Sequence, residues 1–353
     1  METNVIFVFM FLGASPDCSK YFNSAAVSSC SSLVDPTLQG LALQLPGVIR
    51  DKWCSATTLQ YESSFKGWTE WASKFEEVDV LPVQPLHLCL YLISLAQRAV
   101  SIAKLNSAIA GIAWMHKING LDSPTLGNTV SLCIDALKRR LTRPVSKASP
   151  ILPAHIACLV KTMDMDSLTD LRVCSLIVLA FSGFLRFSEL VNLRLEDLNF
   201  LSTYMILNIT SSKTDQLRKG HLVHIARTGS PCCPVSLLER YMAKAEFSIM
   251  DKGFVFRNFS YQKGSVLPRD VDKKMTYTRV REIVKQKFIA IGLDTKSYTL
   301  HSLRSGGASA AARNNVPDRL FQRHGRWRTD SIKNSYLEES TDNLLLVSQN
   351  LGL

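Results

Sequence analysis

One stretch near the carboxyl end of the chain, residues 301–336, gathers side chains of types that can bind an anion or act as a nucleophile. It contains His301 and Arg304, three positions apart, and the aromatic residues Trp327 and Tyr336, nine positions apart. Seven Lys or Arg stand against two acidic residues in the same stretch. Guanidinium groups bind oxyanions, and an activated tyrosine is a nucleophile. Residues of these types at this spacing could converge on one anion.

Helix signals in this stretch predict how the four side chains are held. Ser297 or Thr299 can cap a helix in which His301 and Arg304 lie on one face. The later signals are, in chain order, a turn at Asn314 and Asn315, a helix restarted by Pro317 and ended by Gly325, and a short helix capped by Asp330 or Ser331. Tyr336 is therefore predicted to lie about one and a half turns into that last helix.

Three further polar residues precede this stretch. Arg186 and Glu189 are three positions apart, and Lys213 stands where a predicted strand gives way to a turn. Taken singly, such residues have ordinary explanations, since a surface ion pair is worth less than about 1 kcal/mol and a turn lysine is usually solvated. His301 could likewise be a hydrogen-bonded core histidine, and Tyr336 could pack inward. The order and spacing of the whole set carry the functional prediction.

The composition favours a polyanionic partner in a reducing compartment. The net charge is +11 and the isoelectric point is about 9.2. Nine cysteines are scattered without a CxxC motif, which does not fit a disulfide framework. No apolar run reaches the roughly 18–20 residues of a spanning helix, and the apolar start of the chain lacks the basic residues of a signal peptide. We therefore expect no membrane association and no secretion.

The first part of the chain predicts a leader, a helical domain and a linker. Residues 1–49 contain one basic residue and little helical periodicity, and are predicted to be disordered. Residues 50–141 carry four helical patterns, beginning near Thr57, Pro85, Ser101 and Ser123, and predict a compact all-α domain. Residues 142–153 hold three prolines and two basic residues, which indicates an exposed linker.

The second part, residues 154–353, predicts a mixed domain with a carboxyl-terminal tail. Helical patterns cover residues 153–163, 168–181, 184–198, 234–245 and 276–291. Residues 203–212 and 221–226 read as two strands joined by a polar turn at 213–220, a β-hairpin. The predicted fold class is mainly α with a small β-hairpin or sheet (α+β).

Taken together, the motifs resemble the tyrosine recombinase (phage integrase) family, in particular the shorter integrase-like forms of animal mobile elements. The resemblance is carried by GFLRFSEL (183–190), SSKTDQ (211–216), HSLRSGGAS (301–309) and GRWRTDSIKNSY (325–336). It extends from residue 50 nearly to the end of the chain. It implies a four-helix core-binding domain followed by a tyrosine-recombinase catalytic domain.

The resemblance also implies a reaction. Tyr336 would be the nucleophile that attacks a DNA phosphodiester and forms a 3′-phosphotyrosine bond, with no metal, ATP or other cofactor. Arg186 and Arg304 would bind the non-bridging oxygens, since guanidinium groups bind them bidentately and stay charged. Lys213 would protonate the leaving 5′ oxygen, and His301 would assist proton transfer at the nucleophile.

The resemblance also implies supporting roles for Trp327 and Glu189. Trp327 would donate its indole N–H to the phosphate and pack against the tyrosine helix. Glu189 would orient its neighbours. His324 is a rival for the position of Trp327, but it lies twelve rather than nine positions before Tyr336, so we predict a structural or peripheral DNA role for it.

The expected partners are double-stranded DNA and further copies of the chain. The family implies a tetramer on two DNA sites, and a nuclear location in a eukaryote or a cytoplasmic or nucleoid one otherwise. The apolar cluster at residues 344–347 could dock into a neighbouring protomer or fold back on its own core. The residues predicted to contact DNA are Lys138, Arg139, Arg140, Arg143, Lys147, Arg326 and Arg328.

Two other functions fit the same residues. A type IB topoisomerase would use this catalytic set to relax supercoils. A protein derived from a mobile element could instead have kept DNA binding and lost recombination.

Overall fold

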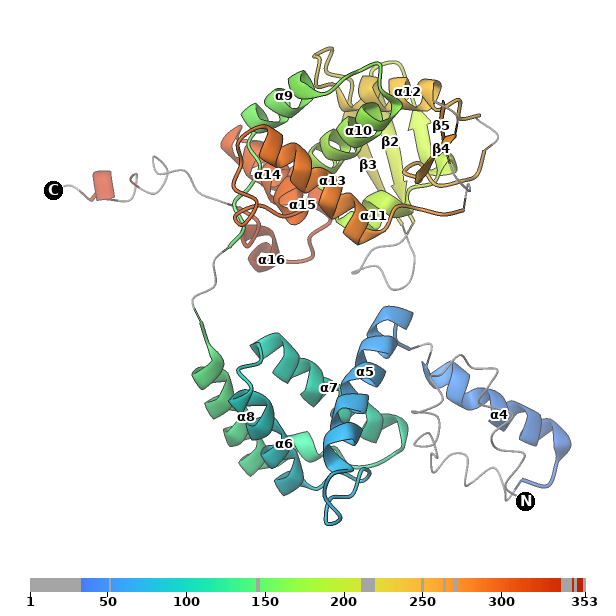
Figure 1. Cartoon of the computed structure of the whole chain (residues 1–353), viewed down its shortest axis with the longest axis vertical. Helices are drawn as coiled ribbons and strands as arrows, with labels where there is room; N and C mark the ends of the chain where they lie inside the picture. The colour runs from blue at the N-terminus through green and yellow to red at the C-terminus, as the bar shows by residue number, and fades with distance from the viewer. Residues whose placement is uncertain are drawn as a thin grey trace. The chain divides into compact units, whose positions relative to one another are not determined.

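The computed structural model describes residues 33–50, 52–143, 147–210, 220–248, 251–262, 265–268, 272–337, 345 and 348–351. The chain divides into two compact units, Met1–Val145 and Ser146–Leu353 (Figure 1). The division falls inside the segment predicted as a linker. Lys213 and the apolar cluster at 344–347, apart from Leu345, lie outside the described residues.

The first unit is helical throughout its described part. Its elements are α4 (Pro36–Arg50), α5 (Ser55–Ala72), α6 (Pro85–Gln97), α7 (Ile102–Ile118), the 3₁₀ turn η1 (Pro124–Leu126) and α8 (Asn128–Leu141). Helix α4 corrects the prediction that residues 1–49 are disordered, since residues 36–49 are helical. The carboxylate of Asp35 accepts hydrogen bonds from the backbone N–H groups of Thr37 and Leu38, at 2.8 and 3.2 Å, and so caps the helix.

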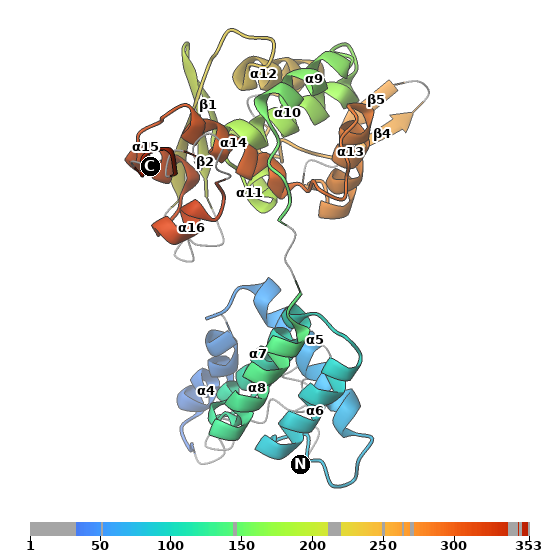
Figure 2. The same cartoon turned by 90° about the vertical axis from the view of Figure 1, so that its left-hand side faces the viewer.

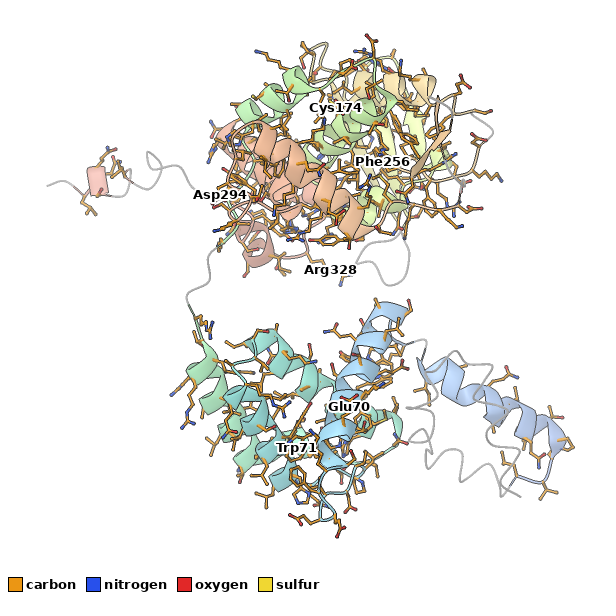
Figure 3. The ribbon with its side chains drawn as sticks, in the orientation of Figure 1. Glu70, Trp71, Cys174, Phe256, Asp294 and Arg328 are labelled. Atoms are coloured by element: carbon orange, nitrogen blue, oxygen red, sulfur yellow. The ribbon has the colours of Figure 1, made fainter. Side chains whose placement is uncertain are left out.

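Helices α5 to α8 bury an aromatic and aliphatic core. Phe65 and Trp68 have no exposed surface, and the indole of Trp68 donates a 2.9 Å hydrogen bond to the carbonyl of Val80. Trp71, labelled in Figure 3, packs with Trp68 and Tyr91 at centroid distances of 5.4 and 5.3 Å. Trp68 and Trp71 of α5 therefore pack on Tyr91 of α6.

The second unit surrounds a buried helix. Its helices are α9 (Pro153–Thr162), α10 (Leu168–Ser182), α11 (Phe187–Asn192), the 3₁₀ turn η2 (Leu195–Asp197), α12 (Pro234–Lys244), α13 (Tyr277–Ala290), α14 (His301–Arg313), α15 (Asp318–Gly325) and α16 (Asp330–Asn334). Every residue of α10 from Leu171 to Ala180 is buried, and α14 lies beside it (Figures 1 and 2). The core of this unit is thus built on α10.

Short strands complete the second unit. They are β1 (Leu198–Phe200), β2 (Tyr204–Ile209), β3 (His221–Ala226), β4 (Phe259–Gln262) and β5 (Ser265–Pro268). Strands β1, β2 and β3 form an antiparallel sheet in that order, and β4 and β5 form a separate hairpin. The β2–β3 register pairs Met205 with Ile225 and Leu207 with Val223, so buried side chains share one face. The prediction of a mainly α protein with a small sheet is confirmed.

The predicted helix at 184–198 is wrong in extent. The chain forms only α11 there, followed by η2 and β1. Phe184 has a positive φ of 46°, and Arg186 is extended, with φ −72° and ψ 154°. Arg186 is consequently the residue before the helix rather than part of it.

The predicted exposed linker is also shorter than 142–153. The backbone N–H of Ser149 donates to the carbonyl of Ser297 at 2.8 Å, and that of Ile151 donates to Ser302 at 3.0 Å. Ile151 has no exposed surface. A Cβ on Gly306 would lie 2.1 Å from the carbonyl oxygen of Ile151, so glycine permits this close approach. Residues 149–153 therefore pack as part of the second unit.

Among the residues that the structure describes, no helix is both long and apolar enough to cross a membrane.

The close packing of α5 on α7 generates a stability prediction. A Cβ at Gly111 would lie 2.8 Å from Ser64 Cβ and 2.9 Å from the carbonyl oxygen of Tyr61. We expect Gly111→Ala to lower the free energy of unfolding by about 1–2 kcal/mol, because overpacking costs up to about 3 kcal/mol while the gain in helix propensity is roughly 1 kcal/mol.

Thermal unfolding followed by tryptophan fluorescence checks this prediction. Gly40→Ala in α4 is the control, since a Cβ at that position would have no neighbouring atom within 4 Å. Equal melting temperatures for Gly111→Ala and wild type would contradict the prediction.

Candidate active site

The carboxylate of Glu189 lies at the centre of the candidate site and has no exposed surface. Its Oε2 accepts hydrogen bonds from the backbone N–H of Arg186 at 2.9 Å and from Nη2 of Arg326 at 2.8 Å. Its Oε1 accepts from Nη1 of Arg186 at 2.6 Å, and Nη1 of Arg304 lies 3.8 Å from Oε2. One buried carboxylate thus holds guanidinium groups from three separate segments.

These contacts control the ionisation of Glu189. Burial alone raises the pKa of a carboxyl group. Arg326, the backbone N–H of Arg186 and the guanidiniums of Arg186 and Arg304 outweigh this effect and hold the pKa of Glu189 below its usual value. Glu189 is therefore an anion at neutral pH.

Arg304 projects from α14 into the interior of the site and has no exposed surface. Its Nη1 donates to the carbonyl of Phe184 and its Nη2 to that of Gly325, the latter at 2.6 Å. Burial, reinforced by the neighbouring charges of Arg186 and Arg326, lowers the pKa of Arg304 to about 10, so the group stays protonated at neutral pH. Arg304, the residue predicted to bind the phosphate, is thus held in place by hydrogen bonds and is covered from solvent.

Aromatic rings surround the guanidinium of Arg304. Its central carbon lies 5.0 Å from the ring centroids of both Trp327 and Tyr336. Tyr336 also packs against Trp327 at 5.4 Å and against His301 at 5.1 Å between ring centroids. The four residues predicted from spacing alone to converge do lie together.

His301 has a depressed pKa in this setting. The residue as a whole is exposed, but protein atoms pack around its ring. This partial burial and the charges of Arg304 and Arg186 lower the pKa of His301, against the opposing effect of Glu189. A lowered pKa leaves the imidazole neutral at pH 7, with a nitrogen able to accept a proton.

The segment from the end of α15 through α16 places Trp327 and Tyr336. The side chain of Thr329 accepts a hydrogen bond from the backbone N–H of Ile332 and caps α16. Lys333 is 7% exposed and binds Asp318 at 2.5 Å and Asp330 at 3.2 Å, which ties α16 to the start of α15.

Two predictions about α16 and the residues beside it are wrong. Tyr336 lies two residues beyond the end of α16, not inside that helix. The cap at Thr329 also differs from the predicted Asp330 or Ser331.

The predicted cap of α14 differs as well. Helix α14 begins at His301. The residue before it, Leu300, makes no capping hydrogen bond through its side chain. Thr299 instead donates its backbone N–H to the hydroxyl of Ser302 at 3.0 Å. His301 and Arg304 still share one face of the helix, as expected from their spacing.

Arg326 does not fit the prediction that it contacts DNA. Its side chain is 1% exposed and binds Glu189 at 2.8 Å, so it does not present a charge to an external partner in this structure. The charge count of the 301–336 stretch does not separate a buried arginine from its exposed neighbours. The sequence does hold one signal at this point, because Gly325 marks the end of helix α15. In the structure the next residue, Arg326, takes the left-handed conformation, with φ 57°.

Most of the other residues predicted to contact DNA belong to other segments of the chain. Arg139, Arg140, Arg143 and Lys147 are exposed, and Lys138 is half-buried in the last turn of α8. Arg328 is exposed at the edge of the second unit, where Figure 3 labels it.

His324 has a position that fits a structural role. Its Nε2 lies 2.9 Å from the carbonyl oxygen of Ser182, and its ring makes an edge contact with Phe184 at 4.7 Å. Burial lowers its pKa, against the effect of the Ser182 carbonyl. His324 therefore packs behind the site, while Trp327 faces Tyr336.

Comparison with known proteins identifies the fold and its relatives. Residues 152–342 match the model of the phage integrase family. That match covers more than half of the chain and includes every residue of the cluster described above. The chain belongs to the phage integrase family. The prediction of a tyrosine recombinase, an enzyme that cleaves and rejoins DNA, is confirmed.

Relatives in this family extend the match beyond the catalytic unit. An integrase/recombinase XerD homologue from Selenomonas ruminantium is 27% identical over 289 residues, which cover 80% of this chain and 81% of that protein. The recombinase Cre of Escherichia phage P1 is 22% identical over 201 residues, covering 55% of this chain and 54% of Cre.

Solved structures share the fold at lower identity. The XerH site-specific recombinase in a post-cleavage complex with its difH substrate has a TM-score of 0.62 and 14% identity, covering 98% of this chain and 95% of XerH. A lambda integrase tetramer bound to a Holliday junction has a TM-score of 0.56 and 13% identity, covering 96% and 85% of the two chains. Both likenesses establish the fold.

The buried ion cluster predicts how stability depends on pH. Glu189→Gln should lower the free energy of unfolding of the second unit by about 3–5 kcal/mol at pH 7, because it leaves buried guanidiniums without a counter-ion. The pKa of Glu189 is lowered in the folded state, so this stabilisation is present above the unfolded pKa of about 4.3 and is lost as the pH falls through the lower folded value.

Urea unfolding of wild type and Glu189→Gln from pH 8 to pH 3.5 measures this dependence. The difference in unfolding free energy should stay constant down to about pH 5 and shrink only below about pH 4. A difference that has already vanished at pH 6 would show that the carboxylate is not held ionised by its arginine neighbours.

Proposed function

We propose that this protein cuts and rejoins DNA at specific sites through a 3′-phosphotyrosine intermediate at Tyr336, without divalent metal or ATP. The observation that carries the proposal is the packing of Tyr336 on Arg304, His301 and Trp327, with Glu189 holding the arginines behind it. A tyrosine nucleophile is thus paired with fixed cations and a neutral imidazole.

The chemical step is an in-line displacement at phosphorus. The phenolic oxygen of Tyr336 attacks the scissile phosphate while His301 accepts its proton, and the bond between phosphorus and the 5′ oxygen breaks. The leaving 5′ oxygen takes a proton from Lys213, which lies outside the described residues. Religation reverses these transfers, with a 5′ hydroxyl attacking the phosphotyrosine. Because the phosphotyrosine bond retains the energy of the broken bond, no ATP is needed.

Charge on the phosphate is stabilised by Arg186, Arg304 and Trp327. The indole N–H of Trp327 is buried and has no acceptor among the described residues, which suits a donor awaiting a phosphate oxygen. Arg304 has no exposed surface, so contact with the phosphate requires Tyr336 to move off its guanidinium. Removal of one such preorganised donor typically costs on the order of 10²–10³ in rate.

DNA is held by basic residues of both units. Lys138, Arg139 and Arg140 lie in the last turn of α8, Arg143 and Lys147 flank the boundary between the units in the sequence, and Arg328 lies in the loop between α15 and α16. Each neutralised phosphate releases counterions, so the affinity should fall steeply with salt.

The working assembly is proposed to be a tetramer on two DNA sites. The likeness to a lambda integrase tetramer on a Holliday junction supports this choice. We further propose an origin in a mobile element and a nuclear location in a eukaryotic host, on the resemblance of the four motifs.

Formation of a covalent adduct tests the proposed reaction. Full-length protein incubated in EDTA, without ATP, with nicked suicide substrates from its own genomic flanks should give a protein–DNA band on a denaturing gel. Tyr336→Phe should abolish the band because it removes the nucleophilic oxygen. Tyr204→Phe is the matched control, since Tyr204 lies at the end of β2 that pairs with Ala226, and it should leave the band unchanged.

Two outcomes of this assay, and one of a separate plasmid-relaxation assay, would count against the proposal. Binding of DNA without an adduct on any substrate would favour a protein that has lost recombination. An adduct that survives Tyr336→Phe would mean that another residue is the nucleophile. Relaxation of supercoiled plasmid without any site preference would favour a topoisomerase.

The proposed DNA path makes a prediction about salt. The double substitution Arg139→Ala with Arg140→Ala should reduce the slope of log affinity against log salt by about 0.9 for each phosphate that the variant no longer neutralises. The control Arg240→Ala with Lys244→Ala removes the same charge from α12, outside the predicted DNA-binding residues. Fluorescence anisotropy between 50 and 300 mM salt, roughly the range in which this effect is large, measures both slopes. An unchanged slope in the α8 variant would exclude these arginines from the interface.

A further inference from the structure

Arg326 combines an unusual backbone conformation with a buried charge. It follows Gly325 with φ 57° and ψ 39°, in the left-handed region that non-glycine residues seldom adopt. Glycine would take this conformation without strain. A residue that keeps a side chain at such a position points to a use for that side chain, because local strain is concentrated at functional sites.

The guanidinium of Arg326 joins segments that are more than 130 positions apart in the chain. Its Nη1 donates to the carbonyls of Gly183 at 3.2 Å and of His324 at 2.7 Å. Its Nη2 donates to the carbonyl of Phe184 and to Oε2 of Glu189, both at 2.8 Å. The Nη groups therefore connect the turn between α10 and α11, the Glu189 carboxylate and the end of α15.

Two of these acceptors also hold the arginines that are proposed to bind the phosphate. The carbonyl of Phe184 accepts from Nη1 of Arg304, and the Glu189 carboxylate accepts from Arg186. Arg326 is itself buried and does not face an external partner in this structure. Its side chain can therefore affect the reaction through Glu189, which contacts Arg186 and Arg304.

We propose that Arg326 is a positioning residue for DNA cleavage: its buried guanidinium keeps Glu189 anionic and fixes Arg186 and Arg304 in the geometry that binds the phosphate. The proposal rests on the proposed recombinase reaction. In this proposal the guanidinium of Arg326 binds Glu189 within the protein and does not contact DNA.

The charges around Glu189 give this role a pH signature. The groups that face it are Arg186 at the start of α11, Arg304 from α14 and Arg326 from the loop after α15, with His301 nearby. Among the groups that keep its pKa low, Arg326 has the largest effect. Without Arg326, burial should raise the pKa of Glu189, and a protonated Glu189 no longer holds Arg186.

Arg326→Gly is the sharpest test because glycine accepts the left-handed backbone and removes only the side chain. We expect single-turnover cleavage at pH 7.5 to fall about 10²-fold, as for a misplacement near 1 Å, with DNA affinity unchanged within about twofold. On acidification the rate of the variant should fall further than that of wild type, because protonation of Glu189 adds to the protonation of His301 that both proteins share. The double variant Arg326→Gly with Glu189→Gln should lose that added pH dependence, since it lacks the titrating group.

Several results would overturn the proposal. A loss of rate that is equal at every pH would indicate a merely structural role, and an unchanged rate would indicate none. Weaker DNA binding by about tenfold or more with an intact cleavage rate would return Arg326 to the DNA interface. If Arg326→Gly does not fold, Arg326→Lys replaces it: a retained charge with fewer donors should lower the rate about tenfold and leave the fall on acidification as in wild type, and a larger fall would contradict the proposal.

A second readout separates this proposal from the reaction itself. Absence of an adduct with wild-type protein would refute the proposed function but not the pairing of Arg326 with Glu189. In that case, urea unfolding of Arg326→Gly decides the matter. Its destabilisation should shrink between pH 7.5 and 5, because protonation relieves the under-compensated carboxylate. A destabilisation independent of pH over this range would refute the pairing.

Discussion

A single buried carboxylate, Glu189, is the constraint on which the catalytic unit depends. Burial of an ion costs several kcal/mol unless oppositely charged groups and hydrogen bonds surround it. Glu189 obtains these from Arg186, Arg304 and Arg326, which lie on three segments of the chain. The cluster can form only when the α10–α11 turn, α14 and the loop after α15 have come together. The arginine cluster therefore depends on the tertiary packing of these three segments.

Small residues make that meeting possible. A Cβ on Gly307 would lie 2.1 Å from the carbonyl oxygen of Phe181, so α14 approaches the end of α10 more closely than a larger residue would allow. Gly306 plays the same part against Ile151. This approach brings Arg304 to the carbonyl of Phe184, and it explains why a glycine pair follows the arginine so closely in the sequence.

The sequence predicts which residues of the 301–336 stretch lie together better than it predicts their surroundings. The nine-residue spacing implied by the family resemblance selects Trp327 over His324, and in the structure Trp327 packs on Tyr336 while His324 lies against the carbonyl of Ser182. The sequence is not enough to place Arg326, since a count of basic residues does not distinguish a buried charge from a solvated one.

Tertiary contacts explain the remaining differences. The extended backbone at Arg186 and the cap at Thr329 depend on such contacts, which local propensity does not contain. For the same reason, the local pattern predicts a helix through Leu193, whereas the carbonyl of Leu193 accepts a hydrogen bond from the backbone N–H of Val255.

The central claim is that Tyr336 forms the covalent bond to DNA within this cluster. The most direct measurement is tandem mass spectrometry of the peptide that carries a nucleotide after the adduct is trimmed with nuclease and protease. We predict a nucleotide 3′-phosphate mass on Tyr336. A nucleotide mass on any other residue, or a linkage through a 5′ phosphate, would contradict the claim.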